Sequence, residues 1–242
     1  MKSACSIVWF KRDLRVFDHA PLAAAVEAGV PTLPLYVIEP GYWQQPFASR
    51  RHWHFIHDSL VELRTDCAGL GQPLIVRTGT ITNVFDSIRH DYEIDAIYAH
   101  EETSNLWGFQ RDDDVRQWCC AHAIKFHEYP TNGIVRRLHD RDDWARIRNQ
   151  RMAAPLIPKP DRLRPVLMEA GQILTKDDTL FGDDVPGVTQ QGGRRAAIKT
   201  LHSFLTDRGS HYLFRLSAPG PSEIYCSRLS AHLTWGTLSA RE

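Results

Sequence analysis

The chain has 242 residues, and its 29 Lys+Arg balance its 29 Asp+Glu to a formal net charge of zero. A hydrophobic content of 43% with 24% charged residues is ordinary for a soluble globular protein. No run approaches the roughly 20 apolar residues of a membrane span, and the amino terminus lacks an apolar stretch long enough for a signal peptide. These properties exclude an integral membrane protein, and we expect a cytoplasmic monomer with no membrane partner.

The zero net charge conceals a difference between the two halves of the chain. Residues 1–133 hold 12 Lys+Arg against 17 Asp+Glu, whereas residues 134–242 hold 17 against 12. The basic excess lies largely between Arg136 and Arg164. A basic surface favours a polyanionic partner, although a solvated segment paired with the acidic first half explains the same composition.

Cysteine and histidine patterns do not indicate a metal site. None of the five cysteines forms a CxxC pair, and no His/Cys spacing suits zinc. His52, His54 and His57 fall on a predicted helix at spacings that put at most two on one face. We therefore predict free thiols and no metal.

The first element is a short apolar run, Ile7 to Phe10, which predicts a strand buried on both faces. A dense group of charges follows it, from Lys11 to Asp18. A helix is then expected up to Gly29, with Asp18 as its cap and Pro21 in its first turn. Ligands of open α/β sheets bind at such turns after strands.

Strands and helices alternate through the rest of the first half. Further strands are expected at 32–38, 73–77, 95–100 and 124–128, and helices at 50–70, 81–90 and 107–123. This alternation predicts βαβ units, and hence a five-stranded parallel sheet with helices on both faces. Neither GxGxxG nor GxxxxGK[ST] is present, which argues against an ordinary dinucleotide or Walker site.

Residues 139–192 are rich in Asp, Arg, Pro and Gly and predict a connector with one short helix near 142–152. A helix from Arg194 to about Arg208 follows the pair Gly192-Gly193, which we interpret as a turn rather than a phosphate loop. We expect an α/β domain at 1–133, a connector at 134–191, and the start of a helical domain at 192–242.

The amino-terminal turn also carries a resemblance. Trp9-Phe10-Lys11-Arg12-Asp13-Leu14-Arg15, followed by Asp18 and Leu22, resembles the amino-terminal signature of the photolyase/cryptochrome family. The resemblance implies a Rossmann-like domain that holds an antenna pigment, followed by an all-α domain that binds FAD. Members of the family run to about twice this length, so we expect the FAD domain to be cut short and its site to be incomplete.

A second segment is similar to the family's flavin-binding motif, in which small hydroxyl residues at a helix start bind the FAD diphosphate. Ser227, Leu229 and Ser230 match that motif, Arg228 lies within it, and Cys226 stands where Thr is usual. Tyr212 is the candidate for the upstream tyrosine that contacts FAD in the family. Short donors at a positive helix end suit a pyrophosphate.

The resemblance also implies an antenna chromophore and a DNA partner. Glu101 and Glu102 follow the fourth strand and are the antenna candidates. Trp107 and Gly108 stand where folate-binding members have Asn and Glu, so the sequence does not identify the pigment. Arg136 and Arg137 are candidate DNA contacts, with damaged DNA bound mainly through the missing half.

The implied activity is that of a deoxyribodipyrimidine photo-lyase, which splits pyrimidine dimers by electron transfer from reduced FAD; we expect the truncated chain to be inactive alone and to contain no catalytic residue. A cryptochrome-type blue-light photoreceptor is the alternative on the same scaffold. A free-standing α/β nucleotide-binding module is a second alternative, because fold does not fix function.

Overall fold

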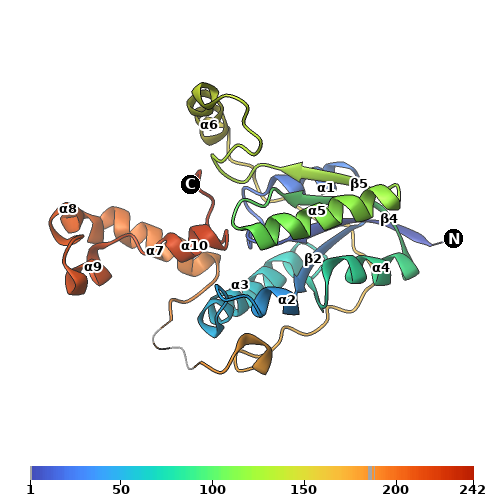
Figure 1. Ribbon diagram of the computed structural model, residues 1–242, viewed down its shortest axis with the longest axis horizontal. Helices are drawn as coiled ribbons and strands as arrows, with labels where there is room; N and C mark the ends of the chain where they lie inside the picture. Colours follow the sequence, from blue (N-terminus) through green and yellow to red (C-terminus); the bar gives the residue numbers. More distant parts are fainter. Residues whose placement is uncertain (1, 185–186, 188) are drawn as a thin grey trace.

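The computed structural model describes residues 2–184, 187 and 189–242, and within them five strands form one parallel sheet (Figure 1). The strands are β1 (Ser3–Phe10), β2 (Thr32–Ile38), β3 (Ile75–Thr78), β4 (Tyr92–His100) and β5 (Lys125–Tyr129). Their order in the sheet is β3-β2-β1-β4-β5, and every neighbouring pair is parallel. The predicted α/β fold class is confirmed.

Helices cover both faces of the sheet. They are α1 (Ala20–Glu27), α3 (Arg50–Gly69), α4 (Ile81–Asp91) and α5 (Leu106–Ala121), and a short α2 (Pro40–Trp43) that the sequence did not indicate. Alternate residues of β1 point to opposite faces: Val8 and Phe10 pack in one core with α1 and α3, and Ile7 and Trp9 pack in the other with α4 and α5. Burial on both faces explains why β1 reads as a continuous apolar run.

The strand order creates a reversal between β1 and β4. The chain passes from β1 outward to β2 and β3, then returns to place β4 on the other side of β1. In such sheets the crevice outside the carboxyl ends of the two strands at the reversal is the usual ligand site. Here those ends are Lys11–Asp13 after β1 and His100–Glu102 after β4.

The connector lies along one side of the α/β part and is joined to it by backbone hydrogen bonds. Leu163 N donates to Leu70 O at 2.7 Å, Thr32 N to Arg164 O at 3.0 Å, and Val76 N to Ala170 O at 2.8 Å. The connector also contains η1 (Arg141–Asp143), α6 (Trp144–Ala153) and η2 (Thr179–Phe181). Residues 185–186 and 188 of the connector lie outside the described residues.

The carboxyl-terminal part is helical, with α7 (Arg194–Thr206), η3 (Arg208–His211), α8 (Tyr212–Arg215), α9 (Pro219–Tyr225) and α10 (Ser230–Thr234). A Cβ at Gly192 would overlap the carbonyl of Phe55, and Gly193 N donates to Ser59 Oγ at 2.9 Å. The glycine pair therefore allows close packing on α3, in keeping with the predicted turn.

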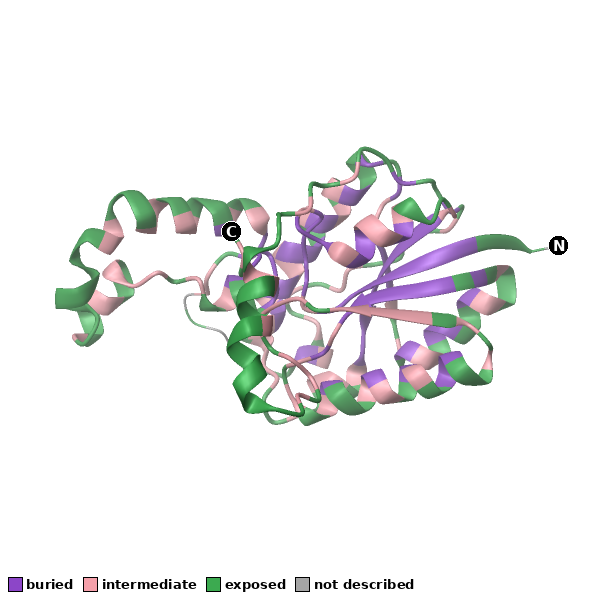
Figure 2. Ribbon diagram, turned by 90° about the horizontal axis from the view of Figure 1, so that it is seen from above, coloured by how far each residue is buried: buried purple, intermediate pink, exposed green. Residues whose placement is uncertain are grey.

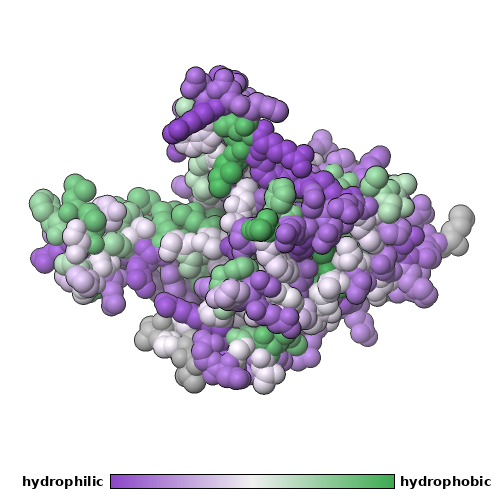
Figure 3. Space-filling view, in the orientation of Figure 1, coloured by the Kyte–Doolittle hydropathy of each residue, from purple (hydrophilic) through white to green (hydrophobic). Residues whose placement is uncertain are grey.

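The helices α8 and α9 extend away from the sheet (Figure 1) and expose apolar side chains, among them Leu213 and Phe214, which are 79% and 86% exposed. Figure 3 shows this region as hydrophobic surface. Among the described residues, none of the helices combines the length and apolarity needed to span a bilayer.

Candidate functional site

The turn after β1 is organised around the buried carboxylate of Asp13. Its Oδ1 accepts a hydrogen bond from Lys11 N at 2.7 Å. Its Oδ2 lies 2.9 Å from His19 Nε2 and 2.7 Å from His100 Nδ1, where His100 is the last residue of β4. Asp13 thus joins the carboxyl ends of β1 and β4 at the reversal in the sheet.

The proton positions in this group follow from its hydrogen bonds. His19 Nδ1 accepts from Leu22 N at 3.1 Å, so Nε2 carries the proton and donates to Asp13. Burial alone would raise the pKa of Asp13, but the two imidazoles that donate to it hold that pKa well below its ordinary value. Burial also lowers the pKa of His100 to about 3, so the imidazole is neutral at neutral pH.

These three side chains place potential ligand atoms within 4.8 Å of one another. Their nitrogens, however, act as N–H donors to the Asp13 carboxylate, and a metal ligand must offer a free nitrogen lone pair. The geometry is therefore that of a hydrogen-bonded group that fixes the strand ends.

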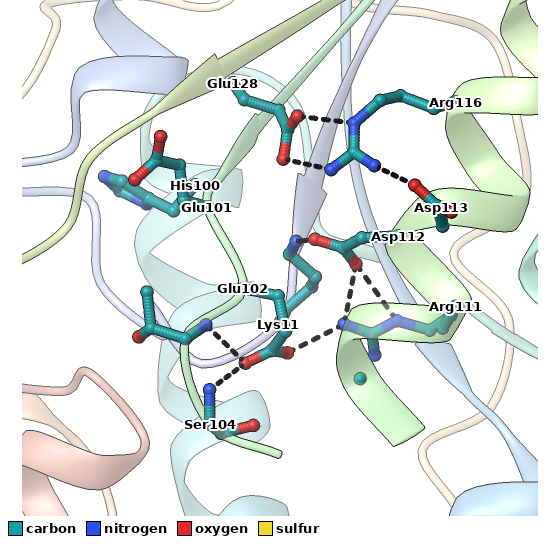
Figure 4. A network of polar contacts seen from close by, with 12 residues as sticks. Lys11, His100, Glu101, Glu102, Ser104, Arg111, Asp112, Asp113, Arg116 and Glu128 are labelled. Carbon is teal, nitrogen blue, oxygen red and sulfur yellow. Dashed lines mark hydrogen bonds and ion pairs between the residues drawn. The ribbon is translucent and has the colours of Figure 1, made fainter. Parts of the chain in front are cut away.

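A second buried network lies next to this group (Figure 4). Lys11 Nζ pairs with Asp112, which is fully buried on α5, and Arg111 Nη2 donates to Glu102 Oε2 at 3.0 Å and to Asp112 Oδ1 at 3.1 Å. Arg111 also donates to Glu39 Oε2 at 3.2 Å. Burial opposes the charge of Arg111, but these three carboxylates outweigh it and raise its pKa.

The two antenna candidates have different surroundings. Glu102 is buried and accepts from the backbone N–H groups of Thr103 and Ser104, each at 2.9 Å. Against the effect of burial, Arg111 and Lys11 lower its pKa to about 2. Glu101 points away from this network (Figure 4), and its Oε1 lies 3.7 Å from Arg136 Nε.

An aromatic cavity of about 40 Å³ adjoins Glu102 and Arg111. Tyr42 is one of the residues that line it, with the centre of its ring 5.4 Å from that of Trp107, 5.1 Å from that of Trp43 and 6.5 Å from that of Trp235. The Arg12 guanidinium lies 4.6 Å from the Trp235 ring. The arrangement offers flat apolar rings beside fixed charges, which suits a planar, polar-edged ligand.

The carboxyl-terminal residues pack on the charged turn. Leu14 N donates to Trp235 O at 3.1 Å, and Arg15 Nη1 donates to Gly236 O at 3.0 Å. Asp18 accepts from Ser239 Oγ and pairs with Arg241. The prediction that Asp18 caps α1 is wrong, because Asp18 has a left-handed backbone with φ of 51° and the cap is His19.

The predicted flavin residues lie at the surface. Cys226, Ser227 and Leu229 are half-buried, Arg228 and Ser230 are exposed, and α10 begins at Ser230. Arg208 holds this segment by donating to the carbonyls of Cys226 and, at 3.2 Å, Ser227. Tyr212 is 38% exposed at the start of α8, and its ring lies 5.8 Å from Phe204.

The two predicted DNA contacts differ in their availability. Arg136 pairs with Glu128 at 2.7 Å, with side chains that are 18% and 15% exposed. Arg137 is exposed. The first of the pair is thus engaged in holding β5, and only the second projects freely enough to reach a partner.

Sequence reasoning did not find the contact between Asp13 and His100, which are 87 positions apart. Each residue lies at or just after the carboxyl end of a predicted strand. The signal was therefore present, but using it requires knowing that β1 and β4 are neighbours.

Three comparisons relate this chain to known proteins. The family model described as DNA photolyase matches residues 6–140. A cryptochrome DASH of Gloeobacter violaceus is 25% identical over 100% of this chain and 52% of its own length. A deoxyribodipyrimidine photo-lyase of Alkalihalophilus pseudofirmus is 24% identical over 97% of this chain and 52% of its own length.

The crystal structure of a class III photolyase from Agrobacterium tumefaciens superimposes with a TM-score of 0.79 at 20% identity, covering 99% of this chain and 52% of that one. At that identity the likeness concerns the fold. The chain spans about half the length of the curated relatives it matches.

Proposed function

This chain belongs to the DNA photolyase family, and from that premise we propose that it is part of a light-driven DNA repair flavoprotein. The proposed activity is that of a deoxyribodipyrimidine photo-lyase, a carbon–carbon lyase that splits pyrimidine dimers in damaged DNA. The observation that carries the proposal is the contact of the Gly236–Arg241 segment with Arg15 and Asp18. It packs the residues that follow the flavin-like motif onto the turn that resembles the family's amino-terminal signature.

We also propose the division of the chain into an α/β domain at 1–133, a connector at 134–191 and a helical segment at 192–242. The hydrogen bonds of the connector along β2 and β3 support treating it as a strap on the first domain.

The helical segment fits the diphosphate of FAD in its chemistry. Ser227 and Ser230 supply short hydroxyl donors next to Arg228; Arg228 and Ser230 are exposed and Ser227 is half-buried, so none of the three lies in a closed core. When bound, reduced FAD supplies the excited-state electron that cleaves the dimer. Ser227, Arg228 and Ser230 would hold the diphosphate of the cofactor from one side.

The aromatic cavity is the proposed antenna site, with Glu102 fixing a polar edge of the pigment and Trp43 and Trp107 contacting its faces. Its present volume of about 40 Å³ is smaller than any pigment. A pigment therefore requires the lining side chains to move apart.

The test is repair of an oligonucleotide that contains a thymine dimer, under blue light, by the product of the complete gene, with a dark incubation as control. Light-dependent loss of the dimer supports the proposal. The relatives include cryptochromes, so absorption of blue light without any repair would favour the photoreceptor alternative.

A further inference from the structure

The connector carries a protruding group of cations that the proposed function leaves unassigned. We propose that residues 137–153, which include η1 and α6 and are here named the arginine arm, bind the phosphate backbone of DNA. This inference rests on the proposed function and names a surface of the chain that contacts the DNA partner.

The arm is ordered as a helix but has no core of its own. All ten residues of α6 are described and none is buried, and Figure 2 shows the helix exposed along most of its length. A helix this short is marginal in water unless one face packs on something. Trp144, whose side chain is large and apolar, is 45% exposed at the first turn.

The charge of the arm is available to an outside anion. The helix α6 contains Arg146, Arg148 and Arg151 and no acidic residue, whereas the part of the arm before it holds Arg137 and Arg141 against Asp140, Asp142 and Asp143. Five arginines and three aspartates give the arm a net charge of +2, and the excess lies on the helix. Arg146 pairs with Asp143 at 3.0 Å, but these side chains are 67% and 54% exposed. Such a surface pair contributes little, so a phosphate can replace Asp143 at small cost.

The arm is nevertheless fixed to the body at its base. Arg151 Nη1 donates to Ile134 O at 2.6 Å. The stem of Arg148 lies so close to Gly133 that a Cβ there would meet Arg148 Cγ at 2.7 Å. These contacts fix the position of α6, and the arginines farther out on the arm are therefore held in place relative to the α/β part.

The base of the arm adjoins the carboxyl-terminal segment. Arg241, which pairs with Asp18, also donates to Ala154 O and Pro155 O, each at 3.4 Å, directly after α6. A DNA strand lying on the arm would thus be close to Arg241 at the carboxyl-terminal end of the chain.

The chemistry favours nucleic acid over a membrane surface. Arginines contact phosphates and an exposed indole stacks on an unpaired base. A membrane-binding helix gathers its apolar residues on one face, whereas Trp144, Ala145, Ile147 and Ala153 spread around α6. Figure 3 shows the tip of the arm as largely hydrophilic.

The test measures binding of the full chain to an undamaged, fluorescein-labelled 20-mer DNA duplex in the dark, by anisotropy across a salt series. The variant R137A/R141A/R146A removes three exposed arm cations and keeps Arg148 and Arg151, which fix the base of the arm. Each lost phosphate contact reduces the slope of log K against log salt by about 0.9, so we expect a slope shallower by about 2 to 3. The matched control, R195A/K199A/R215A, removes three exposed cations from α7 and α8 and is expected to retain the slope.

A second readout uses Trp144. We expect single-stranded DNA to quench tryptophan emission of the wild type and not of Trp144→Phe, which keeps the charge and the helix. An unchanged slope in the arm variant, an equal loss in both triple variants, or binding to phosphatidylserine vesicles without binding to DNA would overturn the inference. Because the assay needs neither a dimer nor light, failure of repair and failure of arm binding are separate results.

Discussion

Arg15 Nη1 donates a hydrogen bond of 3.0 Å to the carbonyl oxygen of Gly236, which lies 221 positions later in the chain. The same guanidinium donates to Asp18 O at 2.7 Å and to Phe17 O at 3.0 Å. Arg differs from Lys in having a planar, rigid guanidinium group that can donate several hydrogen bonds at once. The buried Arg15 therefore fixes the shape of its own turn and binds the carboxyl-terminal segment to it.

The substitution Gly236→Ala tests the packing of the carboxyl-terminal segment on the turn that contains Arg15. Gly236 has φ of 63°, and an added Cβ would overlap the carbonyl of Arg12 and the Cα of Asp13. Strain and backbone overlap together should lower the free energy of unfolding by about 3 kcal/mol or more. Urea denaturation measures the loss, and limited proteolysis should cut first near residue 236.

The control is Gly220→Ala in α9, where a Cβ meets open space and alanine is the better helix former by roughly 0.5–1 kcal/mol. Equal stability of the two alanine variants would contradict the role assigned to Gly236.

His100 gives the protein a pH dependence with a defined sign. Its pKa is lowered from 6.5 to about 3 by burial, so between these values the unfolded chain binds a proton that the folded chain does not. Stability is therefore full above pH 6.5 and falls on acidification, by up to about 1.4 kcal/mol per pH unit from this residue. The depressed pKa of Asp13 adds a further loss below its ordinary value of 3.8.

His100→Asn should make the decline between pH 6.5 and 4 shallower, because the Asn amide can still donate to Asp13 but does not titrate. Urea unfolding at several pH values measures the slope, and the exposed His90→Asn is the control. The interpretation fails if both variants keep the wild-type slope.

The sheet could be predicted from the sequence because its evidence is local. Composition alone predicts a buried strand for runs such as Thr32–Ile38. The site could not be predicted in the same way. Asp13 and His100 are brought together by the order of the strands, and Arg241 is brought to them because the carboxyl-terminal segment packs on the turn after β1. Asp18 shows the limit clearly: its position before Pro21 suggested a helix cap, whereas its carboxylate is occupied by Ser239 and Arg241.

Arg111→Met should be strongly destabilising. The change leaves Glu39, Glu102 and Asp112 close together in a buried region without the cation that compensates them. Removing one partner of a buried ion pair costs about 3–5 kcal/mol. Chemical denaturation measures the effect.

Arg116→Met is its control on the same helix, because Arg116 also pairs with carboxylates but is 28% exposed. Its loss should be about 1 kcal/mol or less. Losses of similar size in the two variants would mean that burial of the Arg111 network contributes no extra stability.

The last prediction concerns flavin retention. Drug-sized ligands are held when 70–90% of their surface is buried, but Arg228 and Ser230 are exposed and Ser227 is half-buried. A chain of residues 1–242 should therefore lose FAD on desalting. The desalted protein should show no flavin absorbance at about 450 nm. Ser227→Ala would not change that result, whereas it should weaken retention in the product of the complete gene. A chain of residues 1–242 that stays yellow after desalting would show that α7 to α10 enclose the cofactor unaided, against the one-sided site that the structure presents.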